Sequence, residues 1–281
     1  MTAETSPIPP TPPPPPAPPS ATPSFPREIP DLPAVPRIPV LIPSAVPAAA
    51  VVPPVRRPWA AAYRLLIAGA AVAAVAVELL TGPPLRVLSH VEIQTAIALA
   101  LVLALSARRA WTARRPLPAA LTGAVLLYVT TAALIHHLFL TETSPPYSIT
   151  GAPGTHPLWQ SAAGHLLDTA LPLAALLDWL LLTEPARLHL RQTASWMLYP
   201  LAYLGFCLTR GALLPPAEQD RYLYPFLDAA RHGYKHVLGN ALLLGLACYG
   251  LGLVLVVLDH VRPNPIRRAA RTGFRLRPPV G

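Results

Sequence analysis

Long runs of apolar residues alternate with short polar segments along most of the chain. A helix needs about 20 predominantly apolar residues to cross the hydrocarbon core of a bilayer, and each run is close to that length. Helices that cover a soluble core instead keep a broad polar face. The pattern therefore predicts an all-α fold, a bundle of six transmembrane helices at residues 61–80, 87–107, 117–140, 162–182, 194–214 and 234–258.

Arginine is unevenly shared between the two sets of connecting segments. One set is rich in it, at residues 56–57, 108–115, 187–191 and 262–277. In the other set, residues 141–161 contain neither Lys nor Arg, and the arginines of residues 215–233 are offset by acidic residues. Short loops that are rich in Lys and Arg stay on the cytoplasmic side. The sequence thus predicts a multi-pass protein of the cell membrane with both termini in the cytoplasm.

The first part of the chain differs from the rest, because more than half of the 39 prolines precede Trp59. Proline removes a backbone donor and favours the polyproline II conformation over helix or sheet. We therefore expect a disordered proline-rich tail at residues 1–57. A six-helix transmembrane domain at residues 58–261 and a basic cytoplasmic tail at residues 262–281 would follow.

The composition supports a membrane protein and argues against a nucleic-acid binder. Hydrophobic residues make up 53% of the chain and charged residues only 12%, whereas soluble domains have about 25% charged residues. The net charge of +9 comes largely from arginines between and after the apolar runs, where they would contact anionic lipid. Membrane lipid is the predicted partner, and the two cysteines form no disulfide framework.

Five of the predicted helices carry a pair of polar residues at helical spacing. Residues three, four or seven positions apart share one face of a helix, and ionisable groups within a bilayer avoid lipid. The pairs therefore predict a polar pocket among the helices near the outer leaflet. Its candidate residues are Glu92 with Thr95, Thr130 with His137 and the adjacent His136, His165 with Asp168, Tyr203 with Arg210, and His236 with Asn240.

The second half of the chain resembles a known family. The residues that carry the resemblance are Leu177-Asp178-Trp179, Trp196-x-x-Tyr199-Pro200, Tyr203, Arg210-Gly211, Tyr224-Pro225-Phe226-Leu227-Asp228, Gly233-Tyr234 and Asn240. Together with the helix around His165, they are similar to an actinobacterial family of six-helix integral membrane proteins of unsettled activity. That family is itself similar to the androgen-induced-protein family of intramembrane hydrolases, which cleave fatty-acid esters of hydroxy fatty acids.

The resemblance implies a threonine nucleophile and a histidine on separate helices. His165 matches the position of the histidine. The chain departs from the family pattern in the second helix, where Glu92 occupies the usual threonine position and Thr95 the usual serine position.

Three functions fit these residues. We favour binding of a lipid or hydrophobic small molecule, without a cofactor or metal ion, by His137, Asp168, Tyr203, Arg210, His236 and Asn240. The alternative is an intramembrane lipid-ester hydrolase with Thr95 as nucleophile and His165 as base, near Glu92, because a hydroxyl nucleophile needs an adjacent base. The third is a metal-dependent membrane enzyme, although the ligand-type residues lack the spacing of a zinc motif.

Overall fold

The structure is a computed structural model that describes residues 56–141, 147–150, 157–185, 187–215 and 221–263. Their regular secondary structure is all helical, with no strand among the described residues, as the sequence predicts. The predicted tails, 1–57 and 262–281, lie almost wholly outside them. The α-helices are α2 (Pro58–Thr81), α3 (Pro84–Ser89), α4 (Val91–Trp111), α5 (Ala119–Ile135), α6 (Leu158–His165), α7 (Leu171–Leu177), α8 (Leu190–Trp196), α9 (Leu198–Leu213) and α10 (Ala229–Val261).

Three π-helical turns interrupt or extend these helices. They are His136–Leu140 after α5, Leu166–Ala170 between α6 and α7, and Asp178–Leu182 after α7. A π-turn holds one residue more than an α-turn, so it rotates the side chains that follow it, and such turns are frequent at functional sites. A 3-10 turn, Pro225–Leu227, precedes α10.

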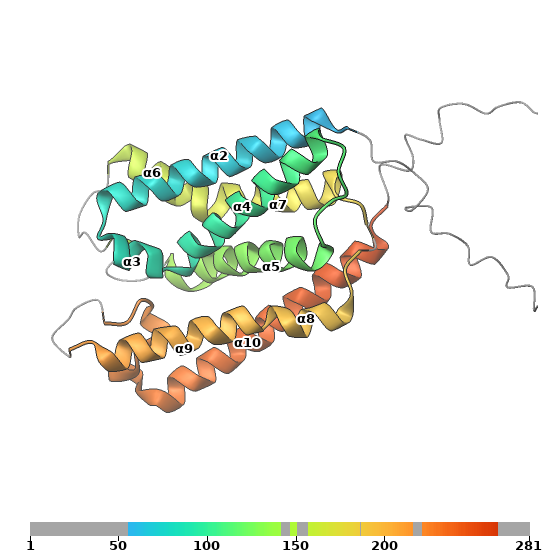
Figure 1. The fold of residues 1–281 in the computed structure, drawn as a ribbon. Helices are drawn as coiled ribbons and strands as arrows, with labels where there is room; N and C mark the ends of the chain where they lie inside the picture. The colour runs from blue at the N-terminus through green and yellow to red at the C-terminus, as the bar shows by residue number, and fades with distance from the viewer. Residues whose placement is uncertain (1–55, 142–146, 151–156, 186, 216–220, 264–281) are drawn as a thin grey trace, which may run out of the picture. The chain divides into compact units, whose positions relative to one another are not determined.

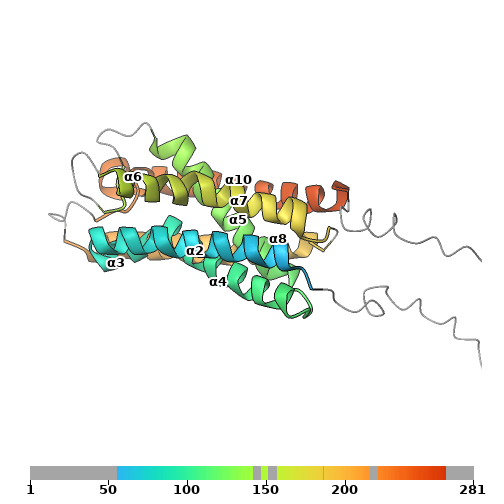
Figure 2. The ribbon, with the colours of Figure 1, turned by 90° about the horizontal axis from the view of Figure 1, so that it is seen from above.

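We refer to α2, α4, α5 and the α6–α7 segment as the four-helix body, which Figures 1 and 2 show side by side. Helices α2 and α4 pack against each other, and both carry small buried residues, among them the fully buried Ala71 and the nearly buried Ala74 and Ala96. Small side chains let two helix backbones approach closely, which is how helices associate in lipid. The largest buried apolar cluster lies mainly in this body.

Helices α9 and α10 form a second unit of packing, which we call the C-terminal hairpin (Figure 1). Its own cluster of buried residues is small and includes Cys207, Leu223 and Val237. One face of α10 is unpacked, since Leu242 and Leu243 are 66% and 65% exposed. In water such a face would favour aggregation, whereas in a bilayer it meets lipid.

Five helices among the described residues are long and apolar enough to cross a membrane: Pro58–Thr81, Val91–Trp111, Ala119–Leu140, Leu158–Leu182 and Ala229–Val261. The structure thus fits a multi-pass membrane protein. The sixth predicted helix, residues 194–214, is instead divided between α8 and α9, and α9 has only 16 residues. Whether it spans the bilayer stays a prediction.

The division between α8 and α9 has a local cause. Pro200 has no backbone N–H, so the carbonyl of Trp196 cannot receive the hydrogen bond that a continuous helix would provide. The hydroxyl of Tyr128 on α5 donates to that carbonyl instead, at 2.8 Å. The junction between α8 and α9 at Met197 is therefore stabilised by a side chain from the four-helix body.

The start of α2 and the end of α10 lie at the same end of the bundle. Arg57 pairs with Glu184 at 3.1 Å, and Arg262 donates to the backbone carbonyl of the same residue at 3.1 Å. This end also contains a nearly buried ion pair, in which Arg64 Nε lies 2.7 Å from Asp178 Oδ1. The side of the membrane that it faces stays the prediction made from the arginines.

Candidate functional site

A buried group of polar and aromatic side chains gathers at the opposite end, where α4 begins. We call His90, Glu92, Tyr147, Tyr203 and Tyr224 the tyrosine–carboxylate cluster. The Tyr224 hydroxyl donates to Glu92 Oε2 at 2.7 Å and accepts the Val91 N–H at 3.1 Å. The Tyr203 hydroxyl donates to the Ser89 carbonyl at 2.8 Å. The start of α4, α9 and the segment before α10 are thus joined by hydrogen bonds to two phenols.

Tyr147 brings the remaining aromatic rings together. Its ring is stacked on that of Tyr224 with centroids 5.9 Å apart, and it meets the edge of the His90 ring at 6.0 Å. Burial and the nearby charge of Glu92 raise the pKa of Tyr147 well above its usual value. The phenol therefore stays neutral at physiological pH and acts as a hydrogen-bonding group.

His90, the residue before α4, has a defined tautomer. Its Nδ1 lies 2.9 Å from the backbone carbonyl of Arg86, which can only accept, so Nδ1 carries the proton. Burial lowers the pKa of His90 to about 4. The ring is thus neutral at pH 7, and its Nε2 presents a lone pair to the interior.

Two of the π-turns bring a second polar pair next to this cluster. His136 Nδ1 lies 3.2 Å from Asp168 Oδ2, and the His136 ring lies 6.3 Å from that of Tyr147. Beside them, His137 Nε2 and Thr169 Oγ1 are 3.0 Å apart. Side chains from α5 and α6–α7 are therefore linked to the tyrosine–carboxylate cluster through Tyr147.

Several atoms in this region are buried without a hydrogen-bond partner. They are His90 Nε2, Glu92 Oε1, His136 Nδ1, Tyr147 Oη and Asp168 Oδ1. The set includes one certain acceptor, His90 Nε2, and one certain donor, the Tyr147 hydroxyl. An unsatisfied buried polar atom is costly, and an ordered water or a bound group is the usual remedy.

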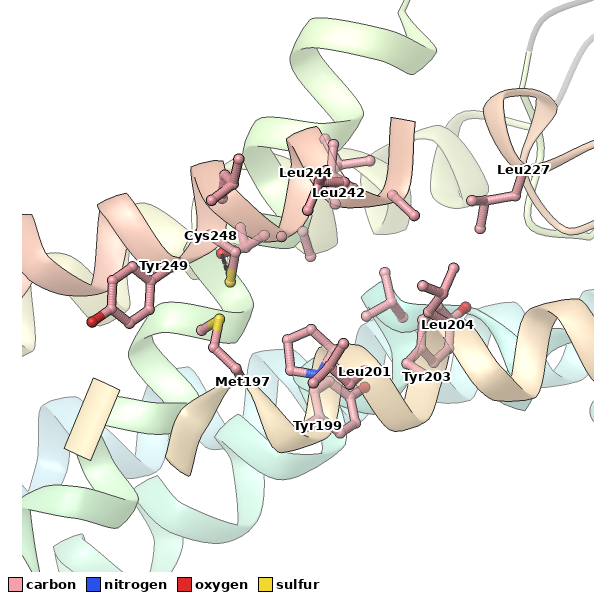
Figure 3. Close-up of a pocket in the computed structure, with 18 of the residues that line it drawn as sticks. Met197, Tyr199, Leu201, Tyr203, Leu204, Leu227, Leu242, Leu244, Cys248 and Tyr249 are labelled. Atoms are coloured by element: carbon pink, nitrogen blue, oxygen red, sulfur yellow. Dashed lines mark hydrogen bonds between the residues drawn. The ribbon is translucent and has the colours of Figure 1, made fainter. Parts of the chain in front are cut away.

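An apolar cavity of about 500 Å³ adjoins the cluster, between α5, α9 and α10. Figure 3 shows side chains from α9 and α10 facing each other across it, with Met197 and Cys248 towards one end and Tyr203, Leu204 and Leu227 towards the other. Tyr203 and Tyr224 belong to both the cavity wall and the cluster. The cavity therefore has an apolar body and a polar group at one end.

The structure brings some of the predicted site residues together. Glu92 and Tyr203 belong to the cluster, and Asp168 lies next to it through His136, whose ring is 6.3 Å from that of Tyr147. Arg210 donates to the Arg221 carbonyl at 3.1 Å, and its charge acts on His90. Of the predicted groups, those on α4, on α5 with its π-turn, on α6–α7 and on α9 each contribute at least one residue to the region, His136 being the one from α5 and its π-turn.

Other predicted residues lie outside the cluster. His137, His165, His236 and Asn240 are exposed, and the Asn240 side chain donates to the Phe226 carbonyl at 3.3 Å. His165 and Asp168 were expected on one face, but Asp168 is buried. The π-turn Leu166–Ala170 intervenes, and its extra residue rotates the two side chains apart.

The predicted nucleophile and base make no contact. Thr95 is buried, and its hydroxyl donates to the Glu92 carbonyl of its own helix at 3.1 Å. His165 is exposed, and no hydrogen bond joins it to Thr95 in the described part of the chain. A base must lie within hydrogen-bond reach of the hydroxyl it activates, so this geometry provides no support for threonine chemistry.

The sequence did not identify His90, Tyr147 or Tyr224 as site residues. Tyr147 and Tyr224 lie outside the predicted helices, although Tyr224 belongs to a motif that carries the family resemblance, and His90 lies in the predicted helix 87–107 but outside its predicted pair, Glu92 with Thr95. Among the described residues, no group of three His, Cys, Asp or Glu side chains is placed to hold a metal ion.

Comparison with known proteins adds no identification, because no family model, curated protein or solved structure matches the chain. The family resemblance stays a prediction.

Proposed function

We propose that this integral membrane protein binds a lipid or another amphiphile, with the apolar part of the ligand in the cavity between α5, α9 and α10. The observation that carries the proposal is the cavity itself. Its volume of about 500 Å³ lies within the range of roughly 300–1,000 Å³ typical of small-molecule sites. Its wall is dominated by Leu and aromatic side chains, which suits an alkyl chain.

The position of the cavity gives a ligand access from the bilayer. Several residues of its wall are also exposed at the surface of the helices, including Leu201 at 63%, Leu242 at 66% and Leu246 at 61%. A hydrocarbon chain could enter between α9 and α10 without crossing a polar surface. Apolar burial then favours a ligand that fills the space, through dispersion contacts with the wall.

Cys248 provides a direct test, since it lines the cavity whereas Cys207, the other cysteine, does not. The Cys207→Ser protein in lipid nanodiscs would be treated with N-ethylmaleimide, and modification of Cys248 followed by mass spectrometry. Hexadecanol, its methyl ether and hexadecyl sulfate would be added separately. We expect at least one to slow the reaction several-fold, and protection by none would overturn the proposal.

Two glycines of α10 provide a matched pair of variants. Gly245 lines the cavity and Gly239 does not, and a Cβ at either meets no atom within 4 Å. We expect Gly245→Phe to fill the cavity and remove ligand protection of Cys248. Gly239→Phe, on an exposed position, should retain it. Equal protection in both variants would show that ligand does not occupy the cavity.

A further inference from the structure

Four tyrosines that line the cavity donate their hydroxyl protons to other groups of the protein. Tyr203 and Tyr224 donate to Ser89 O and Glu92 Oε2, as described above. Tyr128 donates to the Trp196 carbonyl at 2.8 Å, and Tyr199 donates to Gln94 Oε1 at 2.9 Å. A phenol has one proton but two lone pairs. Towards a ligand, each of these hydroxyls can therefore act only as an acceptor.

The other polar groups of the wall add few hydrogen-bond donors to these acceptors. Thr131 Oγ1 and Cys248 Sγ lie 3.6 Å apart, and the contact uses one of their two protons. Tyr249 is 39% exposed, and its hydroxyl points away from the other labelled residues in Figure 3. No Lys, Arg, His, Asp or Glu is among the described residues that line the cavity. The wall thus offers acceptors, few protons and no charge.

Two more polar atoms lie behind the wall, and one of them, the lone pair of His90 Nε2, is an acceptor. Glu92 Oε1 and His90 Nε2 are buried without partners, directly beyond Tyr224. The nearest cations do not serve the cavity: Arg86 donates to the carbonyls of Ser148 and Ile149, and Arg210 to that of Arg221. A group that only accepts hydrogen bonds would meet other acceptors here, and an anion would lose its hydration without a counter-ion.

From this balance we infer that the ligand is a neutral amphiphile whose polar end donates a hydrogen bond, namely a long-chain alcohol rather than an ether, ester or acid. The hydroxyl of the alcohol would lie against Tyr203 and Tyr224, which are 3.5 Å apart at their oxygens. Tyr203 can accept it, because its hydroxyl proton is donated to Ser89 O and the lone pairs of the oxygen remain. This inference rests on the proposed function and specifies the class of its ligand.

Hexadecanol and its methyl ether give the sharpest comparison, because they share the chain and the oxygen and differ in the proton. In the Cys248 protection assay we expect hexadecanol to act at about tenfold lower concentration than the ether, as expected for one hydrogen bond to a buried acceptor. Hexadecyl sulfate should be weaker still. Equal potency of alcohol and ether, or a more potent sulfate, would overturn the inference while the proposed function stands. Protection by none of the three would instead remove the proposed function.

A pair of phenylalanine variants locates the polar end. Tyr203→Phe removes the acceptor next to Tyr224 and should reduce the difference between alcohol and ether to less than twofold, while both still protect Cys248. Tyr234→Phe removes the hydroxyl of a tyrosine that is 55% exposed and does not line the cavity, and it should leave the difference unchanged. If Tyr203→Phe kept the full difference, the alcohol would not lie at this end. The comparison of ligands on protein with both tyrosines intact does not depend on how the variants fold.

Discussion

The helices of the four-helix body are packed more tightly than those of the C-terminal hairpin. In the body, small residues bring α2 and α4 into close contact, and the ion pair of Arg64 with Asp178 is nearly buried. In the hairpin, less than a quarter of the most apolar window of α10 is buried, and a cavity separates α9 from α10. The body holds the fold together, and the hairpin leaves a space that another molecule can fill. Stability and binding are therefore carried by different helices.

The strongest way to break the body is to remove one partner of its buried ion pair. Asp178→Ala leaves the guanidinium of Arg64 without its carboxylate at a site that is about one-tenth exposed. We expect a loss of about 3–5 kcal/mol in the free energy of unfolding, measured by denaturation in mixed micelles.

Glu184→Ala is the matched control, because it breaks the exposed pair with Arg57 and should cost less than about 1 kcal/mol. Similar losses in the two variants would contradict the assignment of the Arg64–Asp178 pair to the stable part of the fold.

His90, where the cluster joins body and hairpin, should make stability depend on pH. Its pKa is lowered to about 4 by burial, against an ordinary value of 6.5. The unfolded chain therefore binds more protons between these values, so stability is full above pH 6.5 and falls as the pH approaches 4. The loss should reach up to about 3 kcal/mol.

Thermal unfolding of the His90→Phe variant from pH 7.5 to 4.0 tests this effect. Phe keeps an aromatic ring beside Tyr147 and Tyr224 but cannot be protonated. We expect a flatter pH profile than that of the unsubstituted protein. Parallel profiles would assign the pH dependence to other groups.

The smallest effect concerns the point where the hairpin meets α8. A Cβ at Gly252 would lie 2.5 Å from Thr193 Cγ2, so a neighbouring group must shift. We expect Gly252→Ala to destabilise the protein by about 1–3 kcal/mol.

Gly239→Ala should be neutral or slightly stabilising, since its Cβ meets no atom within 4 Å and alanine favours the helix. If the two alanine variants unfolded at the same temperature, α10 would not be held against α8 at Gly252.

The sequence allowed the helices to be predicted more readily than the site. Runs of apolar residues determine where a chain can cross a bilayer, and five of the predicted segments are observed as long helices. The break before α9 could not be read from hydropathy, because it depends on the missing N–H of Pro200 and on the distant Tyr128.

The site followed the sequence only in part, for two physical reasons. Helical spacing assumes a regular α-helix, and the π-turn at Leu166–Ala170 separated His165 from Asp168. In addition, His90, Tyr147 and Tyr224 belong to connecting segments, whose side chains meet only through the tertiary fold. Glu92 was identified because a carboxylate in an apolar run is conspicuous in any fold.

The missing amide of Pro200 has a mechanical consequence for the cavity. One wall of the chamber begins where Tyr128 of α5 holds the carbonyl that Pro200 leaves without an amide, and Tyr199 and Tyr203 fasten the same wall to Gln94 and Ser89. Three phenols therefore set the width of the chamber, and the loss of any one of them would change the thickness of guest that it admits.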